Sequence, residues 1–271
     1  MKRLINIIAL LTGLIFTPSL AAQEPSASTP TEMAAMADSA YTDDNFEMAA
    51  DIYKTIIAEF GPSSKLYYNL GNCYYRLGRN GNAIVAYERA LRLDPADKDA
   101  RFNLDFVNAR ITDRPGERGT FMGNALDATA RVMKADAWAW VAFALFAVTI
   151  GGILFYFFTS NVMLRKTGFF GGIAALLLFA VTFFIARRAT SLALDLNQAV
   201  VIAPSTILST VPREPGSRAQ EAMLLHEGTR VEILDSVAST SGTDSIKRVW
   251  YDVEVDNSHR AWIDGSAIER I

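Results

Sequence analysis

The sequence predicts a multi-domain protein with an all-α helical-repeat solenoid, two transmembrane helices and a C-terminal all-β barrel. Three observations predict this fold class. A residue pattern recurs at a fixed spacing between positions 64 and 111, and two uncharged apolar stretches follow it at 137–158 and 167–186. Beyond position 195 the chain consists of short β-branched runs separated by turn residues.

The composition excludes several classes of protein. One cysteine allows neither an intramolecular disulfide nor a multi-thiolate zinc site. Two histidines and a net charge of -3 argue against a histidine-rich metal centre and against nucleic acid as a partner. The sequence holds no Gly-x-Ser-x-Gly motif and no Walker loop, and the single Cys73 has no histidine in its neighbourhood. We therefore expect no catalytic residues, no metal, no cofactor and no enzyme activity.

Residues 1–22 have the layout of a secretory signal peptide. Lys2 and Arg3 precede a mostly apolar run over 4–16, and small residues follow at 17–22 as a cleavage region. The apolar run is shorter than the stretch of about 20 residues that an ordinary membrane-spanning helix needs. An uncleaved anchor is the alternative. Residues 23–31 are rich in Ser, Pro and Ala and are predicted to be a spacer.

Residues 32–112 are predicted to form paired helices that repeat. The pattern at 67–71 recurs at 101–105, and this spacing equals the period of the tetratricopeptide repeat. The core repeat spans 64–97, a degenerate unit precedes it, and one capping helix at about 97–111 follows it. The residues that match the repeat pattern are Tyr67, Leu70, Gly71, Tyr74, Ala83, Tyr87, Ala90 and Pro95.

The first helix of each pair lines a concave groove in this architecture, and the groove holds an extended peptide or a partner helix. We expect a protein-binding groove made by Lys65, Tyr68, Asn72, Tyr75, Arg76, Asn103 and Phe106. Asn72 and Asn103 resemble the asparagines of repeats that clamp a C-terminal carboxylate, but Tyr68 replaces the lysine of that pattern. The alternative is that these residues only pack or face water. Cys73 lies beside the core and is expected to be buried.

Residues 113–136 are predicted to be either a short interfacial helix or a flexible tether. The two apolar stretches within 137–186 are each long enough to cross about 30 Å of hydrocarbon, so we expect a transmembrane hairpin in the lipid bilayer. Two buried helices of a soluble domain are the alternative. Gly168 and Gly172 have a small-xxx-small spacing that favours close helix approach.

The signal peptide sets the expected topology. It places both polar regions on the outer, periplasmic side of the inner (cytoplasmic) membrane, with Arg165 and Lys166 in the cytoplasmic turn. The basic residues on the outer flanks, among them Arg187 and Arg188, favour the opposite orientation. We follow the signal peptide because the first topogenic element usually dominates.

Residues 187–195 are predicted to be a linker, and 196–271 a domain with strands near 199–203, 223–225, 230–237, 248–255 and 260–263. Such strands suit a small closed barrel, which has no exposed edge. The segments 199–202, 225–234, 250–253 and 261–263 resemble a bacterial SH3-like domain, and such domains in exported proteins bind cell-wall peptides or proteins. Trp250 and Trp262 form a possible ligand face, or else belong to the core. His226 and His259 are expected at solvated turns.

The whole-chain order resembles the E component of the Bacteroides aerotolerance (Bat) family. The segments YYNLGN, AYERALRLDP and ARFNL within 40–111 carry the resemblance. It implies membrane partners with von Willebrand A domains, a MoxR-type ATPase on the cytoplasmic side, and a role in stress or oxygen tolerance. We therefore expect a non-enzymatic membrane adapter that assembles envelope proteins through the groove and the barrel. The alternative is an envelope protein that binds peptidoglycan through its SH3-like domain.

Overall fold

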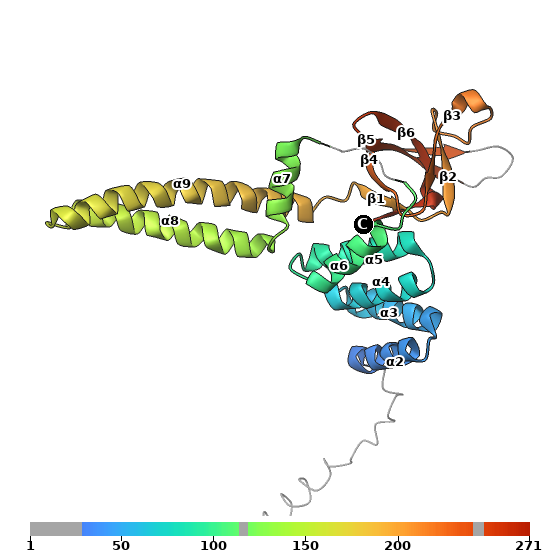
Figure 1. The fold of residues 1–271 in the computed structure, drawn as a ribbon, viewed down its shortest axis with the longest axis horizontal. Coiled ribbons are helices and arrows are strands. Elements are labelled where there is room, and N and C mark those ends of the chain that lie inside the picture. Colours follow the sequence, from blue (N-terminus) through green and yellow to red (C-terminus); the bar gives the residue numbers. More distant parts are fainter. Residues whose placement is uncertain (1–28, 114–118, 241–246) are drawn as a thin grey trace, which may run out of the picture.

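The computed structural model describes residues 29–113, 119–240 and 247–271. The predicted signal peptide at 1–22 and most of the spacer at 23–31 lie outside the described residues. A stack of short helices and a strand module lie at the same end of a long helical hairpin (Figure 1). The polar parts of the chain are therefore together, although the hairpin separates them in sequence.

The helical stack contains two helix pairs and a single helix, as the repeat pattern predicts. Thr29, Asn45, Ser63 and Asp97 each accept a main-chain N–H at the start of a helix, which satisfies donors that the helix leaves free. Gly61 follows the second helix with a φ of 94°, a conformation that favours glycine. The elements are α2 (Pro30–Thr42), α3 (Phe46–Phe60), α4 (Ser64–Arg76), α5 (Asn80–Leu93) and α6 (Lys98–Asn108).

Small residues allow the helices of the core repeat to pack closely. A Cβ atom on Gly71 in α4 would lie 2.6 Å from a ring carbon of Tyr87 in α5. Ala83 and Ala90 are fully buried in α5, and Tyr87 is buried beside them. Any larger side chain at Gly71 would force α4 and α5 apart.

The hairpin consists of α8 (Ala135–Phe158) and α9 (Val162–Ala193). Both helices are long and apolar enough to cross a membrane, and only 11% and 17% of their most apolar segments are buried within the protein. Most of each helix is therefore not covered by the rest of the described chain. The helices touch at glycines, because a Cβ on Gly152 would lie 2.7 Å from the carbonyl oxygen of Gly168. Nothing in 187–193 breaks a helix, so α9 continues through most of the predicted linker at 187–195.

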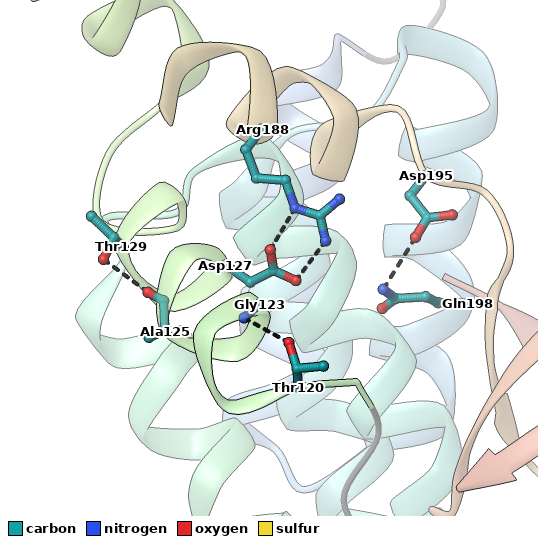
Figure 2. Close-up of polar contacts among 8 residues, drawn as sticks. All are labelled: Thr120, Gly123, Ala125, Asp127, Thr129, Arg188, Asp195 and Gln198. Atoms are coloured by element: carbon teal, nitrogen blue, oxygen red, sulfur yellow. Dashed lines mark hydrogen bonds and ion pairs between the residues drawn. The ribbon is translucent and has the colours of Figure 1, made fainter. Parts of the chain in front are cut away.

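Helix α7 (Phe121–Ala130) crosses the end of the hairpin at a steep angle (Figure 1). Its Asp127 accepts two hydrogen bonds from Arg188 of α9, at 2.5 Å from Nε and 2.8 Å from Nη2 (Figure 2). This paired contact fixes α7 to α9. Of the two expectations for 113–136, the described residues show a docked helix rather than a free tether.

The strand module is one antiparallel sheet with the order β3-β2-β6-β5-β4-β1-β7 in the described residues. Its central side chains, such as Leu208, Val231 and Ile263, form a buried hydrophobic core. The short strands β2 and β7 are not among the predicted ones. The strands are β1 (Gln198–Val201), β2 (Ser205–Ser209), β3 (Glu221–His226), β4 (Arg230–Thr240), β5 (Lys247–Asp256), β6 (His259–Asp264) and β7 (Ile268–Arg270).

The sheet is open and not the closed barrel that the sequence predicts. Strands β3 and β7 form its two ends, and no pairing joins them among the described residues. The edge strand β7 lies against α5 instead. Glu269 of β7 accepts a hydrogen bond from Asn82 and forms an ion pair with Arg89. In a closed barrel β7 would pair with another strand and would not be an edge strand. In this open sheet α5 lies beside it instead.

Candidate functional site

The second helix of the core repeat, α5, carries the strand module. The main-chain N–H of Gly81 donates to Glu227 at 2.8 Å, and a Cβ on Gly81 would lie 2.6 Å from the carbonyl oxygen of Val201. Glu88 is only 5% exposed and pairs with Arg230 of β4 at 2.5 Å. The strand module thus occupies the face of α5 and leaves the first-helix face of the repeats open.

The segment after α6 adds a second polar contact to this interface. The Asp113 carboxylate accepts the main-chain N–H of His226 and the hydroxyl of Thr229, and it lies 2.8 Å from Nδ1 of His226. Burial acts to raise the pKa of Asp113, but these hydrogen bonds outweigh it and hold that pKa below its usual value. His226 is therefore half-buried in an interface and not at the solvated turn that we expected.

The residues predicted to line a groove lie on α4 and α6. Of the predicted residues, Lys65 and Arg76 are exposed, while Tyr68 and Tyr75 are half-buried. Arg76 pairs with Asp44 at 3.0 Å, so its charge is partly neutralised within the chain.

An aromatic patch lies on α4 and α6. The ring of Phe106 is 5.7 Å from that of Tyr75 and 6.5 Å from that of Phe102, and the Arg110 guanidinium lies 3.4 Å from the Phe106 ring centroid. Phe102 is 69% exposed and Phe106 is 37% exposed. We refer to Tyr75, Phe102, Phe106 and Arg110 as the aromatic patch. Phe102 is absent from the predicted groove, although it follows the predicted groove residue Tyr68 by one repeat length.

Asn72 and Asn103, which resemble the asparagines of a carboxylate clamp, hydrogen-bond to each other. The side-chain oxygen of Asn72 accepts the Tyr87 hydroxyl at 2.7 Å and the Asn103 amide at 2.9 Å, which joins α4, α5 and α6. The same arrangement occurs one repeat earlier, where the Tyr53 hydroxyl donates to Asp38. The two asparagines therefore hold the repeats together, which is the packing alternative for these positions.

A small pocket of about 230 Å³ lies in the groove between α2 and α4. Asp38, Tyr41 and Asn72 are among its lining residues. Its lining combines aromatic, amide and acidic side chains.

The remaining candidate residues are mostly structural. Of the two tryptophans predicted as a possible ligand face, Trp250 is only 4% exposed and belongs to the core of the strand module. Trp262 is half-buried. Cys73 is fully buried, and burial raises the pKa of its thiol to about 12. The described residues contain no group of three or more side chains suited to hold a metal ion.

The pattern residues of the core repeat lie where helix packing requires them. Leu70, Gly71, Ala83, Tyr87 and Ala90 are buried. Tyr67, Tyr74 and Pro95 are half-buried beside them. The model of the tetratricopeptide repeat matches residues 64–97, the same segment that the sequence pattern delimits. The chain therefore contains a tetratricopeptide repeat, which suggests a role in binding other proteins. No curated protein matches the chain.

Proposed function

We propose that this protein is a non-enzymatic adapter, anchored by its helical hairpin, that binds a protein partner in the repeat groove. The observation that carries the proposal is the aromatic patch. Its two phenylalanines are exposed on the first-helix face, while the strand module covers α5. Exposed aromatic side chains next to an arginine are typical anchors of protein interfaces.

The hairpin supports membrane anchoring. Its apolar side chains are largely exposed along α8 and α9, and such a surface is unfavourable in water. The hairpin turn is short, at 159–161, so the repeats and the strand module share one side of the membrane. We place them on the periplasmic side of the inner membrane because the sequence begins with the pattern of a signal peptide.

The resemblance to the Bat family suggests which partner the groove binds. It suggests membrane proteins with von Willebrand A domains, and a complex that acts in oxygen or stress tolerance. The segments within 40–111 support this part of the proposal, together with the order of the domains.

Co-purification from native membranes in mild detergent tests the groove. We expect stoichiometric recovery of a membrane protein with the wild type, and its loss when Phe102 and Phe106 are both replaced by alanine. The matched control is Phe60→Ala, which removes a 48% exposed phenylalanine from the end of α3. Unchanged recovery with the double variant would show that the groove does not bind the partner.

A further inference from the structure

A cavity of about 390 Å³ lies where the membrane hairpin meets the repeats and the strand module. Its walls come from α5 and α6, from the segment between α7 and α8, from the last turn of α9, and from β1 and β4. Helix α6 also carries part of the aromatic patch, but Tyr75, Phe102, Phe106 and Arg110 are not among the residues that line the cavity. The cavity is thus distinct from the aromatic patch.

The depth of the cavity relative to a bilayer follows from the hairpin. The uncharged part of α9 ends at Ala186, and the lining residues of α9 lie at 189–193. At 1.5 Å per residue they are roughly 5–10 Å beyond the hydrocarbon, which is the layer of the lipid headgroups. On the other helix the lining residues at 134–136 directly precede the uncharged run of α8. Both helices therefore bring the cavity to headgroup depth.

The lining is rich in cations. Glu88 pairs with Arg230, and Asp94 lies 3.5 Å from Lys134. The cationic lining residues are Arg92, Arg101, Arg131, Lys134 and Arg230, against the acidic residues Glu88, Asp105 and Asp136.

Arg101 and Arg131 have no carboxylate side chain within 4 Å in the described part of the chain. Arg101 donates to the carbonyl oxygen of Pro95 at 3.0 Å, whereas Arg92 donates to a main-chain oxygen of the last residue, Ile271, at 2.6 Å. Burial lowers the pKa of Arg92, the charges of Asp195 and Glu88 oppose this shift, and the charge of Arg131 adds to it. An anion bound in the cavity would give Arg101 and Arg131 the charged partner that they lack.

The cavity also has an apolar side. Leu91, Met133 and Leu192 line it together with Ala189 and Ala193. A free phosphate would gain nothing from such a wall, whereas the glycerol and first acyl carbons of a lipid would bury apolar surface there.

We propose that this cavity binds the phosphate of an anionic phospholipid headgroup, with the acyl chains directed along the hairpin. The inference rests on the membrane anchoring proposed above and is independent of the groove. A lipid bound in this way would join the hairpin, the repeats and the strand module at the membrane surface.

Native mass spectrometry of the full-length protein in detergent tests the site. The protein is stripped of lipid and then given equal amounts of phosphatidylglycerol and phosphatidylcholine. We expect one phosphatidylglycerol to be retained with at least about tenfold preference, and this preference to fall about tenfold in an Arg101→Gln/Arg131→Gln variant. Arg187→Gln is the matched control, because Arg187 is an exposed arginine at similar depth on α9 that does not line the cavity. Equal retention of the two lipids, or full retention by the double variant, would overturn the proposal.

Two further measurements are needed. One identifies the molecule that carries the phosphate, and the other tests membrane anchoring independently of lipid binding in the cavity. Glycerol phosphate or inorganic phosphate should fail to displace the lipid at equal concentration, and displacement would overturn the lipid assignment in favour of a soluble phosphate ester. Carbonate extraction of membranes tests the anchor itself. Retention of all variants in the membrane, with loss of lipid preference only in the double variant, supports the cavity. Release of the wild type would refute the anchor and with it this site.

Discussion

The ion pair between Glu88 and Arg230 tests whether the strand module is docked on the repeats. Replacing Arg230 by alanine leaves a carboxylate that is 5% exposed without its partner. Breaking a fully buried pair in this way costs about 3–5 kcal/mol. The Arg230 side chain is 31% exposed, so water reaches the vacated position, and we expect a loss of about 2–3 kcal/mol in the free energy of unfolding.

A double-mutant cycle separates the pair from other effects of the substitutions. The cycle uses Glu88→Leu and Arg230→Met, each alone and both together. The double variant removes both charges and should be within about 1 kcal/mol of the wild type, whereas Arg230→Met alone should be destabilising like Arg230→Ala. The assay is urea unfolding of the full-length protein in detergent, followed by tryptophan fluorescence. Two of the four tryptophans, Trp250 and Trp262, lie in the strand module.

The control is the exposed contact between Arg248 and Glu214, whose side chains are 48% and 77% exposed. Arg248→Ala should cost less than about 0.5 kcal/mol, because exposed ion pairs contribute little. The reasoning would be refuted if Arg230→Ala were as mild as this control, or if the Glu88 and Arg230 substitutions were simply additive.

Three other predictions concern the repeat and its contact with the strand module. Gly71→Ala should lower the free energy of unfolding by about 1–3 kcal/mol, because the new Cβ would meet the Tyr87 ring. Adding Tyr87→Leu should recover part of this loss in thermal unfolding. If stability were not recovered, a clash with Tyr87 would not be the cause. The Asp113 pKa is lowered in the fold, so its contribution to stability is complete above its ordinary pKa of about 3.9 and is lost as the pH falls through the folded pKa. Asp113→Asn should weaken this loss in a pH series of unfolding curves, and an unchanged acid dependence would exclude the carboxylate. Cys73 should react with maleimide at pH 7 only after unfolding in urea, since rapid labelling of the native protein would mean that the thiol is accessible.

The repeat and the hairpin were predictable because their signals are local. Gly71 and Ala83 have the spacing that close helix pairs require, and the family model matches the same residues. The apolar runs of α8 and α9 are also read directly from composition, although the end of α9 was not. Helix α9 continues past Arg187 to Ala193, and there Arg188 contacts Asp127, which lies 61 positions earlier.

Two of the predicted groove residues, Tyr75 and Phe106, lie side by side in the aromatic patch. Phe102 was not predicted there, because a sequence pattern does not report the exposure of a side chain. Asn72 and Asn103 were predicted to line the groove, and the structure shows in addition that they hydrogen-bond to each other. An asparagine has the same sequence signal whether its partner is a ligand or a neighbouring helix.

The sequence by itself determined the helices of the repeat, the apolar hairpin and most strands, since each depends on residues that are close together in the chain. Tertiary structure alone decided how these parts combine. The contact of Gly81 with Glu227 joins residues 146 positions apart, and that of His226 with Asp113 joins residues 113 positions apart. No local periodicity encodes such pairings, because they form only when separately folded surfaces become complementary. For the same reason the sheet remains open, with its edge strand covered by α5.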